Sequence, residues 1–254
     1  MAEPMTGRVA LVTGVSRRAG IGDAIARRLG SLGASLFLHS YSPHDREQPW
    51  GADPRVPGGF AIEEAHLEVD LGEPDGPQTL VDAAVERFGH VDVLVCNHAQ
   101  SGHDGPLETM DAARLDRHFA VNTRSSILLA KAFAAQHDGR RGGRVIFMTS
   151  GQDLGPMPGE LAYAASKGAL ASITKSLADH LAGRGITVNA VNPGPVDTGY
   201  APPDALAAVA KRFPGGRWGE PDDPARLIAW LAGDDGEWIT GQVINTEGGF
   251  RRWD

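Results

Sequence analysis

The stretch VALVTGVSRRAGIG, residues 9–22, decides the fold. Its first four residues are apolar and predict a buried strand, a glycine-rich turn follows, and an amphipathic helix is expected from Ile21 onward. Glycine lets a backbone approach a pyrophosphate without a Cβ in the way, and a helix N-terminus adds free N–H groups with partial positive charge. The pattern indicates an anion-binding turn, although such turns can also serve only to pack a helix against a strand.

Apolar runs of the same kind recur along the chain, with helix-length segments between most of them. Strands are expected at 8–12, 34–39, 65–69, 91–96, 144–148, 186–191 and 242–245, and helices at 21–32, 77–88, 161–181 and 224–231. This alternation predicts an α/β fold of the Rossmann type, a doubly wound parallel sheet with helices on both faces. No linker or tandem repeat interrupts it, so a single domain is expected over residues 1–254.

Two segments depart from the alternation. The stretch from Tyr41 to Gly59 contains four prolines and is expected to be an irregular loop with room for one short turn of helix. The stretch from Tyr200 to Pro214 contains a short apolar helical pattern, which fits either a substrate lid or an ordinary surface helix.

Composition restricts the partners. The net charge of −8 disfavours nucleic acid and anionic membranes, so a small-molecule substrate is expected. The nine histidines show no metal-ligand spacing, and no metal site is expected. Cys96 is the single cysteine, which excludes an internal disulfide and fits a reducing compartment. Without a signal-peptide pattern or an apolar run of roughly 20 residues, a cytoplasmic protein that does not span a membrane is expected.

Three side chains suggest acid–base chemistry. Tyr163 and Lys167 are four residues apart in an expected helix, which places them on one face about 6 Å apart along the axis. A nearby ammonium favours the phenolate form of tyrosine and so lowers its pKa. Tyr-x-x-x-Lys occurs by chance in many helices, but here Ser150 ends a buried strand, at the sheet edge where α/β proteins bind ligands.

Together these residues make the chain resemble the short-chain dehydrogenase/reductase family, closest to its 3-oxoacyl-thioester (acyl-carrier-protein) reductase type. The resemblance rests on the glycine turn, on Ser150 thirteen residues before Tyr163, and on the segments 96–100, 121–124 and 192–198. Two departures stand out. The glycine turn is two residues longer than the family pattern, and His98 and Gln100 replace an Asn and a Gly of the family motif.

The resemblance implies the following site. Its catalytic residues are Asn122, Ser150, Tyr163 and Lys167. Its cofactor residues are Gly14, Ser16, Arg17, Arg18, Gly20, Ile21, Gly22, Ser40, Tyr41, Asp70, Leu71, Asn97, His98, Ala99, Tyr163, Lys167, Pro193, Gly194, Val196 and Thr198. The family also implies a homo-oligomer, with a tetramer expected.

The end of the second expected strand bears on the choice of cofactor. NAD-binding folds place an acid there, whereas a nearby arginine accommodates the 2′-phosphate of NADP. The position is Ser40, and Arg17 and Arg18 lie in the glycine turn. NADP is therefore favoured over NAD, unless both arginines are only solvated surface charges.

The implied reaction is hydride transfer between a nicotinamide cofactor and a ketone or secondary alcohol. Ser150 would donate a hydrogen bond to the carbonyl oxygen and Tyr163 would supply the proton. Lys167 would lower the pKa of Tyr163 and hold the nicotinamide ribose, and Asn122 would anchor a relaying water. Two alternatives stay open. One is an enoyl-thioester reductase, suggested by the longer glycine turn and opposed by the Tyr–Lys spacing; the other is a cofactor-sensing protein without turnover.

Overall fold

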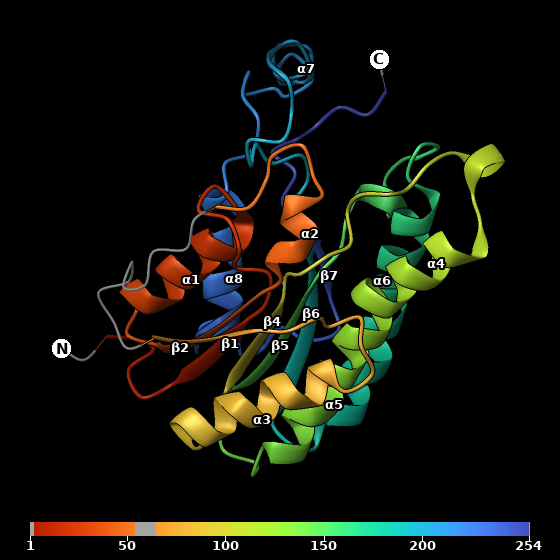
Figure 1. The fold of residues 1–254 in the computed structure, drawn as a ribbon. Coiled ribbons are helices and arrows are strands. Elements are labelled where there is room, and N and C mark those ends of the chain that lie inside the picture. Colours follow the sequence, from red (N-terminus) through yellow and green to blue (C-terminus); the bar gives the residue numbers. More distant parts are fainter. Residues whose placement is uncertain (1–2, 54–63, 254) are drawn as a thin grey trace.

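The computed structural model describes residues 3–53 and 64–253, and these form a seven-stranded sheet flanked by helices (Figure 1). Its strands are β1 (Val9–Val12), β2 (Ser35–Ser40), β3 (Glu64–Glu68), β4 (Val93–Cys96), β5 (Gly143–Met148), β6 (Ile186–Asn192) and β7 (Val243–Asn245). The order is β3-β2-β1-β4-β5-β6-β7, and every neighbouring pair is parallel. The predicted doubly wound α/β fold is confirmed.

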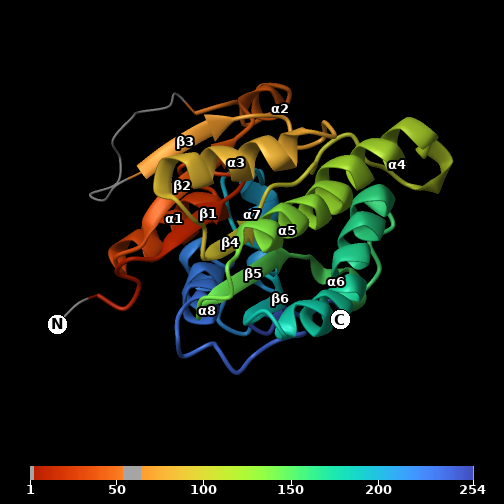
Figure 2. The same cartoon turned by 90° about the horizontal axis from the view of Figure 1, so that it is seen from below.

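Side-chain alternation along the strands divides the core into two halves. In β1, Val9 and Leu11 pack into one apolar cluster, while Ala10 and Val12 pack into the other. The first cluster is covered by α3 (Gly76–Phe88), α5 (Ser125–Gln136) and α6 (Leu161–Ala182), and the second by α1 (Ile21–Ser31) and α8 (Asp222–Ala232). Figure 2 shows these two helical layers on opposite faces of the sheet.

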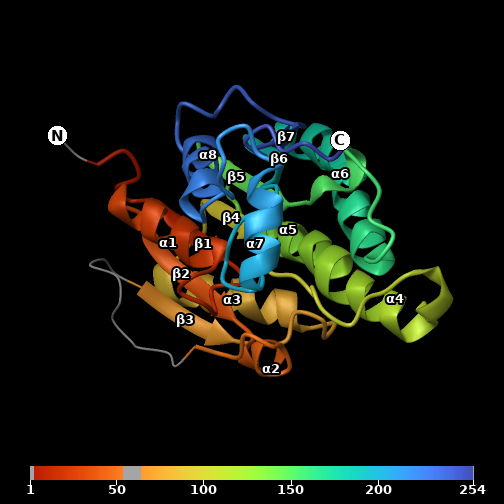
Figure 3. The same ribbon diagram turned by 90° about the horizontal axis from the view of Figure 1, so that it is seen from above.

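Helical structure also occupies stretches outside the predicted helices. The helix α4 (Ala112–His118) continues through a π-helical segment, Phe119–Arg124, directly into α5. The stretch from Tyr41 to Gly59 begins with a short helix, α2 (Ser42–Arg46), as the sequence allowed, and its residues 54–59 lie outside the described part. The helix α7 (Pro203–Ala210) rises above the sheet in Figure 1 and overlies its middle in Figure 3.

The order of the strands determines where a ligand can bind. The chain reverses direction across the sheet between β1 and β4, which are neighbours, so the loops that follow them diverge and leave a crevice at their carboxyl ends. Within residues 3–53 and 64–253, no helix is both long and apolar enough to cross a membrane.

Candidate active site

A cavity of about 720 Å³ contains most of the predicted cofactor residues. Those that line it are Gly14, Ser16, Arg17, Gly20, Ile21, Gly22, Tyr41, Asp70, Leu71, Asn97, His98, Ala99, Tyr163, Pro193, Gly194, Val196 and Thr198. They come from loops that follow different strands, and the fold brings them together at one edge of the sheet. Ser150 lines the same cavity, so the candidate catalytic and cofactor residues share one space.

Three of the predicted cofactor residues do not line this cavity. The hydroxyl of Ser40 is buried against His66, 2.8 Å from its Nε2 atom. Arg18 is exposed, and its backbone N–H donates to Asp53 at 2.8 Å. Lys167 lies behind the cavity wall, 2% exposed. Consecutive residues of a strand point to opposite faces of the sheet. His39 therefore lines the cavity, and its neighbour Ser40 does not.

Close backbone packing explains the glycines of the first turn. Gly14 has a φ of 71°, and a Cβ there would lie 2.8 Å from the Cα of His98. A Cβ on Gly22 would collide with the carbonyl oxygen of Gly14. The extra residues form a tight turn closed by the Gly20 N–H, which donates to the Arg17 carbonyl at 2.9 Å. The lengthened loop therefore keeps the close approach of turn and helix that anion binding requires.

Two buried histidines, His39 and His98, make hydrogen bonds to this turn, and no role was predicted for His39. Burial lowers the pKa of His39 to about 4 and that of His98 well below its ordinary value, so both rings are neutral at pH 7. The Gly14 N–H donates to Nδ1 of His39 at 3.2 Å. The proton of the neutral ring is therefore on Nε2 of His39, which donates to the Val69 carbonyl at 2.8 Å. The only signal in the sequence was a histidine within an apolar strand.

His98 connects the same turn to the helical layer. Its Nδ1 atom lies 2.7 Å from the hydroxyl of Thr13, and its Nε2 atom lies 2.7 Å from the hydroxyl of Ser125. The Ser125 hydroxyl donates to the Val121 carbonyl, so it accepts the Nε2–H of His98. The histidine that departs from the family motif thus joins the segments after β1 and β4 to α5 at the cavity wall.

The candidate catalytic pair lies at the start of α6. Tyr163 and Ser150, which follows β5, line the cavity together, and Ser150 is close enough to the phenol to act on its pKa. Burial is the main cause of a raised pKa at Tyr163, the Glu160 carboxylate raises it further, and Ser150 opposes the rise. The expected lowering of this pKa by Lys167 is wrong for the cofactor-free protein, because burial outweighs it and Lys167 is not among the groups that shift it. The phenol is consequently protonated at neutral pH, the form that a proton donor requires.

Lys167 lies one helical turn further along. Its Nζ atom is 5.7 Å from the ring centroid of Tyr163 and donates to the carbonyl of Met148 at 2.8 Å. Burial lowers its pKa to about 8, so the side chain is mostly an ammonium at pH 7. The i, i+4 spacing thus places a buried cation beside the phenol.

Asn122 lies in the π-helical segment, fully buried and away from the cavity wall. Its Oδ1 atom accepts the backbone N–H of Gln100 at 2.7 Å, and its Nδ2 donates to the hydroxyl of Ser166 at 2.8 Å. That hydroxyl donates to the carbonyl of Tyr163 at 2.8 Å. Asn122 therefore ties the loop after β4 to the first turns of α6.

Other residues on the cavity wall were not predicted, and several belong to the C-terminal segment. Phe250, Arg252 and Trp253 line the cavity, and Arg252 forms an ion pair with Glu247. The Arg252 guanidinium packs so tightly on Gly151 that a Cβ there would collide with it. This segment therefore forms the wall beside Ser150.

Trp50, for which the sequence predicted no role, lies at the cavity wall. Its ring lies 5.3 Å from the guanidinium carbon of Arg17 and 6.4 Å from the ring of Tyr200, which precedes α7. Trp50 thus connects the segment after α2 with the glycine turn on one side and the α7 segment on the other. Cation–π and aromatic contacts of this kind stabilise by about 1 kcal/mol each.

Known proteins match the chain over nearly its whole length. The family model described as enoyl-(acyl carrier protein) reductase matches residues 14–251. An uncharacterized oxidoreductase, YjdA, of Bacillus subtilis is 43% identical over 96% of this chain and 97% of its own length. The versicolorin reductase stcU of Emericella nidulans is 33% identical, covering 98% of this chain and 97% of its own.

A solved structure agrees. A short chain dehydrogenase from Burkholderia cenocepacia in complex with NADP superposes with a TM-score of 0.84 at 35% identity, covering 97% of this chain and 98% of that one. The sequence matches and the structural match agree, and the chain belongs to the short-chain dehydrogenase/reductase family.

Proposed function

We propose that this oxidoreductase interconverts a ketone and a secondary alcohol with NADP(H), and that its substrate is a 3-oxoacyl thioester or a related ketone. The observation that carries the proposal is that Ser150 and Tyr163 line one cavity with the glycine turn, while the buried Nζ atom of Lys167 lies 5.7 Å from the centroid of the phenol ring. Donor, acid and cation are then adjacent to a dinucleotide site.

The residues present fit a nicotinamide dinucleotide. Gly14 and Gly22 leave backbone surface that a Cβ would obstruct. Arg17 lines the cavity, and its Nε atom is buried without a hydrogen-bond partner among the described residues. Such a group is costly unless a ligand satisfies it. When bound, the cofactor supplies or accepts the hydride.

The side chains would act as follows in ketone reduction. Ser150 donates a hydrogen bond to the carbonyl oxygen and so orients the substrate. Tyr163 transfers its proton to that oxygen as negative charge develops there. The ammonium of Lys167 stabilises the phenolate that remains, because opposite charges attract strongly where water is excluded.

The test is the oxidation of NADPH and NADH, followed by absorbance, with β-keto esters, acetoacetyl and crotonyl thioesters, and simple ketones. We expect turnover of the keto compounds and none of crotonyl thioester. Turnover of the crotonyl thioester alone would support the enoyl reductase alternative, which the description of the family model keeps open. Tight cofactor binding without turnover of any substrate would favour the sensor alternative.

The proposed preference for NADP rests on Arg17 and Tyr41, because the hydroxyl of Ser40 is engaged with His66. We expect Arg17→Ala to raise the Kd of NADPH about 10-fold to 100-fold and that of NADH much less, since a charged hydrogen bond contributes about 1.5–3 kcal/mol. Arg18→Ala is the matched control, because Arg18 does not line the cavity and should leave both values unchanged. Equal losses for both cofactors would place Arg17 on a group that they share.

We also propose a homotetramer in the cytoplasm. Trp230, Trp238 and Val243 are exposed large apolar residues, and Val243 belongs to β7, a strand at the edge of the sheet. Trp238 is 93% exposed in the single chain. Light scattering should give a mass near four chains, and Trp238→Glu should give smaller species. A monomeric wild-type protein would contradict the assembly.

The proposed cytoplasmic location is supported by Cys96, a buried free thiol.

A further inference from the structure

The N-terminus of α6 is completed by residues from a distant loop. Glu160 immediately precedes the helix, and its side chain makes no capping hydrogen bond. The first turn nevertheless leaves four backbone N–H groups that the helix itself cannot satisfy in full. Tyr163 is the third residue of this turn, so any loosening there would move the candidate acid.

Each of these N–H groups has a partner, and the loop after β4 supplies three of them. The N–H of Leu161 donates to the carbonyl of Gly105 at 3.5 Å, and that of Ala164 donates to the Glu160 carbonyl at 2.9 Å. The N–H groups of Ala162 and Tyr163 donate to the Asp104 carboxylate, at 3.1 Å to Oδ1 and 2.7 Å to Oδ2. The helix end is therefore held mainly by residues more than fifty positions earlier in the chain.

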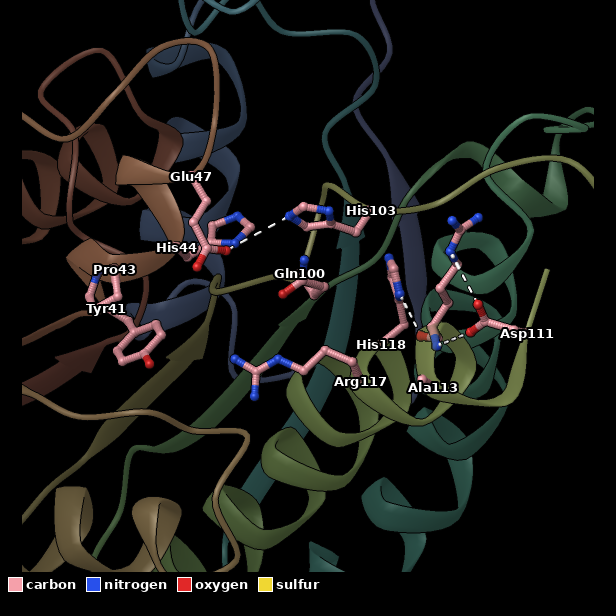
Figure 4. A pocket seen from close by; sticks show the side chains of 11 residues that line it. Tyr41, Pro43, His44, Glu47, Gln100, His103, Asp111, Ala113, Arg117 and His118 are labelled. Carbon is pink, nitrogen blue, oxygen red and sulfur yellow. Dashed lines mark hydrogen bonds and ion pairs between the residues drawn. The ribbon is translucent and has the colours of Figure 1, made fainter. Parts of the chain in front are cut away.

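Asp104 is itself fixed in place. Its side chain is 7% exposed, and Oδ1 also accepts the backbone N–H of Gly105 at 2.8 Å. Oδ2 lies 3.8 Å from Nε2 of His118 on α4. His118 is held in turn, because its Nδ1–H donates to the carbonyl of Arg114 at 2.8 Å. Figure 4 shows His118 and Arg117 on the α4 side of a smaller cavity that Tyr41, His44 and Glu47 line on the other side.

We propose that Asp104 is a positioning residue for the reaction, since its carboxylate binds the first turn of α6 and so holds the Tyr163 phenol against Ser150. A carboxylate at a helix N-terminus gains from the positive end of the helix dipole as well as from two charge-assisted hydrogen bonds. It touches neither substrate nor cofactor, because it does not line the large cavity. The inference rests on the proposed function of Tyr163 as the proton donor.

Asp104→Asn and Asp104→Ala test the role in a graded way, because asparagine keeps one acceptor oxygen and alanine keeps none. We expect kcat for ketone reduction to fall about 10-fold to 100-fold in Asp104→Asn and further in Asp104→Ala, as misplacement of a reacting group by about 1 Å can do. The Kd of NADPH should stay within about twofold of the wild-type value, because the glycine turn is not in contact with Asp104.

Asp111→Asn is the matched control. Asp111 caps the neighbouring helix α4, where its carboxylate accepts the N–H of Arg114 at 2.9 Å, and that helix carries none of the proposed catalytic residues. The control variant should lose some stability and keep its kcat. A loss of kcat in Asp111→Asn as large as in Asp104→Asn would overturn the proposal.

A second measurement does not depend on turnover. The chain has three tyrosines, so the double variant Tyr41→Phe/Tyr200→Phe leaves Tyr163 alone for an ultraviolet titration of the phenol. Burial raises the pKa of Tyr163, so a frayed first turn should lower that pKa toward its ordinary value. We expect this shift when Asp104→Ala or Asp104→Asn is added and not with Asp111→Asn.

The two readouts separate the possible failures. If the wild-type protein reduces no ketone, the proposed function fails, and the titration still decides whether Asp104 holds Tyr163. An unchanged titration would overturn the proposal, and so would a shifted titration with unchanged kcat, because the cap would then be only structural. If Asp104→Ala does not fold, Asp104→Asn supplies both measurements.

Discussion

Tyr163→Phe should lower kcat for ketone reduction by about 100-fold to 10,000-fold, the range expected when a positioned acid is removed. Phenylalanine keeps the ring in its half-buried position and removes only the hydroxyl, together with its interaction with Ser150. The Kd of NADPH should change little, because the glycine turn and the loops after β4 and β6 remain as they are. Single-turnover absorbance and fluorescence titration would measure the two effects separately.

Ser150→Ala provides the comparison for this variant. It removes the hydroxyl proposed to bind the carbonyl oxygen and leaves the acid in place, so its kcat should fall less than that of Tyr163→Phe. If Tyr163→Phe turned over at nearly the wild-type rate with normal cofactor affinity, the assignment of the proton donor would be wrong. The site would then need a different acid within reach of the carbonyl oxygen.

The sheet could be predicted from the sequence because its strands are buried on both faces. Runs such as residues 144–148 and 186–191 are apolar without interruption, and the structure has β5 at Gly143–Met148 and β6 at Ile186–Asn192. α5 gives a weaker signal. Small and apolar residues occupy several of its sides, so residues 125–136 show no single apolar stripe.

Some parts of the candidate site could be predicted from the sequence and others could not. The shared helix face of Tyr163 and Lys167 follows from their spacing, where geometry depends on neighbours in the sequence, and the family resemblance added Ser150 to them. Contacts between distant residues do not follow from spacing. Asp104 and Tyr163 are 59 positions apart, and only the folded sheet brings the loop after β4 against α6.

The side of the sheet on which the Ser40 hydroxyl lies could not be predicted from the sequence either. Counting along the second strand identified the correct end of that strand, yet it could not tell on which side the hydroxyl lies. The structure turns Ser40 toward His66 and turns His39 toward the cavity. A register shift of one residue exchanges the two faces of a strand, so this choice depends on the packing of the whole sheet.

Lys167→Met should have opposite effects on activity and stability. The ammonium stabilises the phenolate of Tyr163, so we expect kcat to fall by about 100-fold or more. In the wild-type enzyme, ketone reduction should weaken as the pH rises above about 8, because Lys167 loses its proton there. Tyr163 does not explain such a fall, since its pKa is raised and the phenol keeps its proton.

The stability effect follows from the lowered pKa of Lys167, which burial reduces from 10.5 to about 8. Between these values the unfolded chain binds a proton that the folded chain does not, so the free energy of unfolding rises with pH across this window. Below pH 8 the cost of burying the charge is present in full. The variant also loses the hydrogen bond to the Met148 carbonyl. Lys167→Met should therefore be more stable than the wild type at pH 7 by about 2 kcal/mol.

Thermal unfolding of the cofactor-free proteins at pH 7 and pH 10 would measure this difference. The advantage of Lys167→Met should shrink toward zero at pH 10, because the wild-type lysine is then neutral in the folded state. Lys175→Met is the matched control, since Lys175 is an exposed residue of the same helix and its loss should change the Tm little at either pH. A less stable Lys167→Met at pH 7 would mean that the hydrogen bond to Met148 outweighs the desolvation of the ammonium, and that the buried lysine contributes to the fold as well as to the reaction.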